Sequence, residues 1–122
     1  MKNLPGALLL KWSPEVVDEG FVPFPKKLLR VLHQIFKGEE AMEELAVILA
    51  IVDYRRPNLT RPPSCGYLAF LAGLPDGRVR EILKTLEAKE LIKCTEGPIG
   101  IDVDIDGILQ KIQSLTDDES VA

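Results

Sequence analysis

The stretch from Ser64 to Cys94 is the feature that most constrains the fold of this chain. Ser64 is a good helix cap, because its hydroxyl can accept a hydrogen bond from a free backbone N–H of the first turn. Gly73 suits the left-handed conformation in which helices commonly end. A second helix is expected over residues 75–89, because its apolar residues recur at the spacing of one buried helical face. These residues are Val79, Ile82, Leu83 and Leu86. The stretch therefore predicts a short helix, a turn, a longer helix and then a strand.

The polar side chains of the second helix are expected to point away from its buried face. They are Arg78, Arg80, Glu81, Lys84 and Thr85. This is the layout of a helix-turn-helix, in which the second helix lies across the first and is presented to a groove of DNA.

Two sets of residues, one within residues 64–94 and one upstream of them, resemble sequence patterns of a known protein family. Within the stretch they are Leu68-Ala69, Ala72-Gly73-Leu74, Val79, Leu83, Leu86-Glu87 and Leu91-Ile92. Upstream of it they are Trp12-Ser13-Pro14, Gly20-Phe21-Val22-Pro23 and Leu28-Leu29. The first set resembles the winged helix-turn-helix of bacterial and phage regulators and replication initiators. The second set is similar to the lead-in of plasmid and phage replication-type (DnaD-like) proteins. Together the similarities span roughly residues 12–115.

The resemblance implies a mainly α fold with a small β-hairpin, a winged helix-turn-helix of about five helices. We expect an N-terminal arm and extended lead-in over residues 1–24, the folded domain over 25–115 and an acidic tail over 116–122. The arm is apolar and is expected to pack on the body or on a partner. With 122 residues, the chain is long enough for one domain with a working core. Its length also fits one domain of a longer protein.

Two further helices are expected before the helix pair. One runs from Pro25 to Gly38, with these side chains inward: Leu28, Leu29, Leu32, Ile35 and Phe36. The other covers residues 39–52, and its expected core stripe is Met42, Leu45, Ala46, Leu49 and Val52, with Ile48 beside it. The segment 53–63 contains three prolines and is expected to be a loop.

A hairpin and a last helix are expected after the helix pair. The predicted strands cover residues 91–95 and 99–105, joined by the turn 96–98. This tip is short and acidic, so we expect it not to contact phosphate. Asp106 is expected to cap the last helix, whose inward residues are Ile108, Leu109, Ile112 and Leu115.

The charge of the chain is unevenly distributed. The formal net charge is −4, yet residues 64–94 carry five Lys or Arg against four Asp or Glu, and the preceding loop adds three arginines against one acid. Residues 95–122 carry one lysine against seven acids. Positive charge therefore gathers on the helix pair and the loop that leads into it, which favours a DNA-binding face modestly.

The resemblance and the charges together give a set of candidate DNA-contacting residues. They are Arg78, Arg80, Lys84 and Thr85 in the major groove, Arg55, Arg56 and Arg61 on phosphates, and Ser64 at the start of the first helix. The expected partner is double-stranded DNA, bound by a homodimer, in transcriptional regulation or replication initiation. Asp76 and Gly77 depart from the family pattern, because they occupy first-turn positions that normally reach the DNA.

Two alternatives stay open beside DNA binding. The loop arginines are as well explained by solvation and pairing with nearby acids. The whole domain can instead serve as a protein-interaction module of a replication or regulatory assembly, with the arm and the acidic C-terminal face meeting partners. A further departure from the family is Glu90, which stands where many relatives have glycine, and a left-handed conformation there would cost about 1 kcal/mol.

Nothing in the sequence indicates catalysis, a cofactor or a metal. Asp102, Asp104 and Asp106 match the opening of a calcium loop, but its twelfth position is Gln113 instead of the required glutamate. His33 is a lone histidine, expected at the surface, and Cys65 is expected to be a small half-buried residue. Two isolated cysteines fit a reducing cytoplasm, and no apolar run is long enough to span a membrane. We therefore expect a cytoplasmic protein that is not an enzyme.

Overall fold

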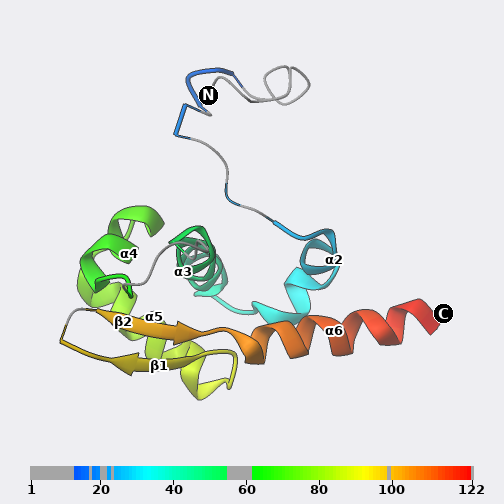
Figure 1. The fold of residues 1–122 in the computed structure, drawn as a ribbon. Coiled ribbons are helices and arrows are strands. Elements are labelled where there is room, and N and C mark those ends of the chain that lie inside the picture. Colours follow the sequence, from blue (N-terminus) through cyan, green and yellow to red (C-terminus); the bar gives the residue numbers. More distant parts are fainter. Residues whose placement is uncertain are drawn as a thin grey trace.

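The computed structural model describes residues 13–16, 18–19, 22, 24–54, 62–98 and 100–121. This part of the chain holds five helices and one antiparallel hairpin of two strands (Figure 1). The helices are α2 (Lys26–Ile35), α3 (Ala41–Tyr54), α4 (Cys65–Ala72), α5 (Asp76–Ala88) and α6 (Asp106–Val121), and the strands are β1 (Lys93–Glu96) and β2 (Ile101–Asp104). The predicted mainly helical class with a small hairpin is therefore confirmed.

The α4–α5 pair forms as the sequence predicts. The Ser64 hydroxyl accepts a hydrogen bond from the backbone N–H of Tyr67 at 3.1 Å, so it caps α4. Gly73 ends that helix in the left-handed region, at a φ of 72°. The predicted buried stripe of α5 is also confirmed, because each of its four residues is at most 5% exposed.

The helix α2 buries Leu28, Ile35 and Phe36 as predicted and differs at one position, whereas α3 turns a different face inward. In α2, Leu29 is 62% exposed and Val31 is fully buried in its place. In α3 the predicted stripe is wrong: Met42 is 84% exposed, and its other members are only partly buried. The residues of α3 that are buried are Glu44, Val47, Ile48, Ala50 and Ile51. Because α3 is apolar on nearly every side, spacing alone selects no face. Packing against α4 and α5 decides which side is buried.

The hairpin keeps the predicted alternation over shorter strands. Ile101 and Val103 are buried, whereas Asp102 and Asp104 are exposed. Cys94 pairs with Val103 in the antiparallel register. The first strand begins at Lys93, two residues later than predicted, and Leu91 and Ile92 are buried between it and α5.

The last helix differs from the prediction at both ends. The Asp104 carboxylate, not that of Asp106, accepts the hydrogen bond at its start, from the backbone N–H of Asp106 at 2.8 Å. Ile108 is buried as predicted, but Leu109 is 51% exposed. The helix continues through the predicted acidic tail to Val121.

The elements form two groups around one core (Figure 1). The helix α3 packs against α4 and α5, and α5 contacts β1, while α2 packs against α6. The two groups meet at Gly107, where the backbone of α6 approaches the end of α5 very closely. A Cβ on Gly107 would lie 2.1 Å from the carbonyl oxygen of Glu90. Beside it, the N–H of Ile108 donates to the carbonyl oxygen of Leu91 at 2.9 Å.

Candidate nucleic-acid interface

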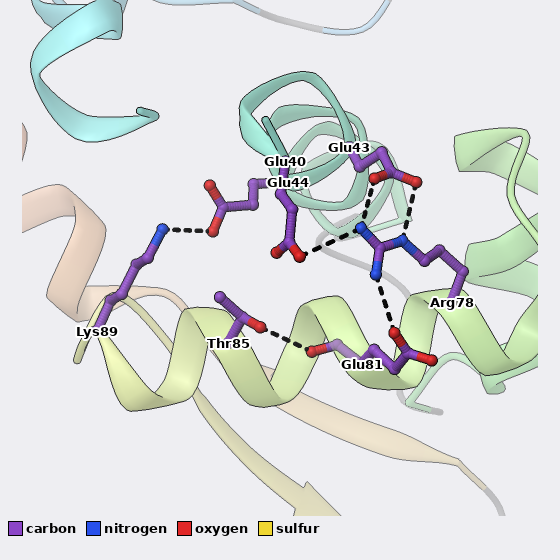
Figure 2. A network of polar contacts seen from close by, with 7 residues as sticks. All are labelled: Glu40, Glu43, Glu44, Arg78, Glu81, Thr85 and Lys89. Carbon is purple, nitrogen blue, oxygen red and sulfur yellow. Dashed lines mark hydrogen bonds and ion pairs between the residues drawn. The ribbon is translucent and has the colours of Figure 1, made fainter. Parts of the chain in front are cut away.

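Arg78, the first candidate contact on α5, faces α3 and is surrounded by carboxylates (Figure 2). Its Nε and Nη2 donate to the two carboxylate oxygens of Glu43 at 3.0 and 2.6 Å. Nη2 also lies 3.4 Å from Glu40 Oε1, and Nη1 lies 2.9 Å from Glu81 Oε2. The hydrogen bond from Arg78 lowers the pKa of Glu43, and the same contacts raise the pKa of Arg78. Arg78 thus ties α5 to the first turns of α3.

Arg80 and Lys84 lie one helical turn apart on the side of α5 that faces the hairpin. Together with Leu83, Cys94 and other residues they line a groove of about 310 Å³ between α5 and the two strands. Arg80 Nη1 is 3.0 Å from Glu96 Oε1, and the Arg80 side chain is 50% exposed. That hydrogen bond is the main cause of the raised pKa of Arg80. Lys84 is exposed and makes no ion pair within the described part of the chain.

The two predicted hydroxyl contacts bond to backbone atoms of their own helices. The Thr85 hydroxyl donates to the carbonyl oxygen of Glu81 at 3.1 Å, and the Ser64 hydroxyl caps α4. The predicted phosphate contacts Arg55, Arg56 and Arg61 lie outside the described residues. Of the candidates that are described, the structure therefore brings Arg80 and Lys84 together as exposed cations on α5. Lys93, at the start of β1, is a further exposed cation that the sequence analysis did not select.

An ion pair with one buried partner joins the end of α5 to α3, and the sequence analysis missed it. Lys89 Nζ lies 2.7 Å from Glu44 Oε2, and the Glu44 side chain is 0% exposed (Figure 2). The other carboxylate oxygen of Glu44, Oε1, accepts no hydrogen bond from the described residues. Glu44 is the first residue of the stripe of α3 that is buried. Val47, Ile48 and Ile51 follow it at the i+3, i+4 and i+7 positions of the same helical face. Because the spacing of apolar residues in α3 does not select this stripe, the sequence carries no local signal that Glu44 is buried.

The second residue after α5 adopts the left-handed conformation that the sequence analysis named as costly for a residue other than glycine. Glu90 has a φ of 62°, in the left-handed region that favours glycine. The Glu90 N–H donates to the carbonyl oxygen of Glu87 at 3.0 Å. The Leu91 N–H donates to the carbonyl oxygen of Leu86 at 3.1 Å. These bonds close the end of α5 and direct the chain into β1.

The two thiols lie in environments that disfavour the thiolate. Cys65 is buried, as opposed to the half-buried position expected, and its Sγ is 3.6 Å from the carbonyl oxygen of Asp76. Burial is the main cause of its raised pKa. Burial, with the charges of Glu87 and Glu96, raises the pKa of Cys94 to about 11. Because the thiolate is the reactive form of cysteine, neither site favours nucleophilic chemistry.

The described residues offer few other side chains that could form a catalytic or metal site. His33 is exposed on α2, as expected. Within the described ranges no three His, Cys, Asp or Glu side chains are grouped so that they could hold a metal ion. No helix in that same part of the chain has both the length and the apolar character needed to cross a bilayer. A comparison of the chain with known protein families, curated proteins and solved structures found no match.

Proposed function

We propose that this chain is a winged helix-turn-helix protein that binds duplex DNA, with α5 in the major groove and the hairpin as the wing. The observation that carries the proposal is the pair formed by Arg80 and Lys84. The pair lies on the hairpin side of a helix whose apolar stripe is buried in the core. A rigid helix held in this way can present cations to phosphates and base edges.

The contacts of α5 sort its two arginines into different roles. The Arg80–Glu96 pair lies in water, where ion pairs contribute little because the solvent screens them, so a phosphate can displace Glu96. Arg78 instead bonds to both oxygens of Glu43 and to two more acids, and all of these contacts would be lost if it turned to DNA. We therefore assign Arg78 to the α3–α5 contact and leave Arg80 and Lys84 as the groove contacts.

Other parts of the proposal rest on the sequence. Arg55, Arg56 and Arg61 are retained as phosphate contacts because they precede the helix pair along the chain. A homodimer is retained because helix-turn-helix proteins commonly bind two half-sites about one DNA turn apart. Transcriptional regulation and replication initiation both use such binding.

The test is the salt dependence of duplex binding, measured by fluorescence anisotropy with a labelled duplex of mixed sequence. The Arg80→Ala/Lys84→Ala variant should bind more weakly, and its slope of log affinity against log salt should be shallower by about 2. The matched control is Lys26→Ala/Lys27→Ala, which removes the same charge from exposed positions on α2. Equal losses in both variants, or no duplex affinity of the unaltered protein at about 50 mM salt, would refute the proposal.

A second candidate function, a protein-interaction module, is favoured by an aromatic cluster on α4. The Tyr67 ring lies 5.5 Å from that of Tyr54 and 6.3 Å from that of Phe70, between ring centroids. Phe70 is 73% exposed and Tyr67 is 43% exposed. Exposed aromatic residues of this kind often anchor protein interfaces. If DNA binding is the function, Phe70→Ala should leave duplex affinity unchanged. A protein without duplex affinity would favour this second candidate.

A further inference from the structure

An apolar groove lies between α2 and the start of α3. It has a volume of about 310 Å³ and is lined mainly by Leu29, Leu32 and Phe36 from the α2 side and by Met42 and Leu45 from α3. Leu29 and Met42 also project from it, with exposed fractions of 62% and 84%. Apolar side chains gathered in this way commonly mark a docking site. Because a hollow and protruding side chains lie next to each other, the surface has the form that packing against a copy of itself requires.

The α2 side of the groove has a basic edge. Residues 24–38, which include α2, contain four Lys or Arg and no Asp or Glu. Lys26 precedes Leu29 by three residues and therefore lies on the same helical face, and Lys37 directly follows Phe36. Both lysines are exposed. A partner that docks in the groove therefore meets positive charge along α2.

The α3 side of the groove has an acidic edge. Residues 39–53, which include most of α3, contain five Asp or Glu and no Lys or Arg. Glu39 is exposed just before α3. Glu40 and Glu43 both lie against Arg78, at 3.4 and 2.6 Å (Figure 2). Because one guanidinium offsets one negative charge, these three acids together with Arg78 keep a net negative charge at this edge.

The charge pattern selects the occupant of the groove. A two-fold axis through the groove would place the basic edge of one copy over the acidic edge of the other, and the same contact would occur twice. Opposite charges that meet across an interface favour the correct partner, whereas like charges exclude wrong ones. A second copy of this chain supplies both the complementary charges and the protruding apolar side chains.

We propose that two copies of this chain pair through the groove, with α2 of each copy over the start of α3 of the other. Leu29 and Met42 are covered in the pair. The inference rests on the homodimer of the proposed function and names its surface. Arg80 and Lys84 line a different groove, beside the hairpin, so pairing in this way leaves them accessible to DNA.

The first test is the molar mass of the full-length protein in analytical ultracentrifugation at micromolar concentration, without DNA. The unaltered protein should sediment with twice the 13.5 kDa of one chain, and Leu29→Asp/Met42→Asp should sediment as single chains. The matched control is Phe70→Asp/Leu109→Asp, which puts the same charges on exposed apolar side chains of α4 and α6 and should remain paired. All four side chains are largely exposed, so the fold should survive, as far-UV circular dichroism will show.

The second test reverses one edge at a time. In Lys26→Glu/Lys37→Glu both edges are acidic, and in Glu39→Lys/Glu40→Lys both are basic. Each variant alone brings like charges together twice, so its self-association should weaken about tenfold or more. In an equal mixture, each altered edge can meet an edge of opposite charge. Mixed pairs should therefore form, which fluorescence-detected sedimentation will show when only one variant carries a dye.

Three results would overturn the inference. One is unaltered protein that sediments as single chains at micromolar concentration. Another is a pair that persists in Leu29→Asp/Met42→Asp or is lost equally in the α4 and α6 control. The third is a mixture of the two edge variants that forms no more pairs than either variant alone. Duplex binding through Arg80 and Lys84 is measured separately by anisotropy, so the interface and the proposed DNA contacts can fail independently.

Discussion

Replacing Lys89 with methionine is the sharpest probe of the contact between α5 and α3. The substitution keeps most of the apolar stem of the side chain and removes the ammonium group that lies 2.7 Å from Glu44. The Glu44 carboxylate is 0% exposed, and its second oxygen already lacks a hydrogen bond from the described part of the chain. The variant therefore leaves a buried charge without any partner among the described residues.

The size of the effect follows from the burial of each partner. Breaking a buried ion pair by removing one partner typically costs about 3–5 kcal/mol. Because Lys89 itself is 41% exposed, water can enter at its position, and we expect the lower end, about 3 kcal/mol. For a domain of this length that corresponds to a fall in Tm of roughly 12 °C. The Glu44→Leu/Lys89→Met variant removes both charges and should regain most of this loss, because an apolar replacement of a buried pair is often neutral or stabilising.

Urea denaturation, monitored by circular dichroism, measures these differences in the free energy of unfolding. The matched control is Lys84→Met, a lysine of the same helix that makes no ion pair with the described residues and should change stability by less than about 0.5 kcal/mol. If Lys89→Met loses no more stability than this control, or if the double variant is as unstable as Lys89→Met, the pair does not compensate the buried carboxylate and the reasoning is wrong.

Three further predictions concern the backbone and the thiols. Gly107→Ala should destabilise the protein by about 3 kcal/mol in urea denaturation, because the new Cβ would meet the Glu90 carbonyl oxygen. Gly77→Ala, with no atom within 4 Å of its Cβ, should instead add up to about 1 kcal/mol. Glu90→Gly should relieve the positive φ and raise stability by about 0.5 kcal/mol, whereas Glu90→Ala should raise neither stability nor Tm. For Cys94, burial followed by two nearby carboxylates raises the pKa to about 11. Its contribution to stability is therefore full below the unfolded thiol pKa of about 8.5 and is lost as the pH rises through 11. Between about pH 8.5 and 11 the urea midpoint should fall less steeply with pH for Cys94→Ala than for the unaltered protein. Parallel plots of midpoint against pH for the two proteins would contradict the raised pKa of Cys94.

The sequence predicts α4 and α5 well because their signals are local. Ser64 and Gly73 mark the ends of α4, and α5 has a narrow apolar stripe between charged sides, so its spacing leaves one choice of buried face. The strained Glu90 could also be anticipated, because it follows the helix where a left-handed residue is needed. In each case the residues that determine the structure lie within a few positions of one another.

The contacts that the sequence could not predict join distant segments. The helix α3 is apolar on most sides, so only its neighbours decide that Glu44 is buried and Met42 is exposed. The acids that surround Arg78 include Glu43, which precedes it by 35 residues. No local pattern shows that such a pair will meet, so the sequence could not indicate that Arg78 bonds to α3.

The helix α6 has a practical consequence for anyone who shortens this protein. It is separated from β2 by Ile105 alone, and it is the main neighbour of α2. A gene trimmed after the hairpin would keep the α4–α5 pair and both strands, yet it would remove the support beneath α2. Leu28, Val31 and Ile35 are buried in the full chain, and each apolar side chain brought into water costs about 1.5–3 kcal/mol. The acidic C-terminal segment continues this supporting helix, so a minimal fragment of the protein should retain it.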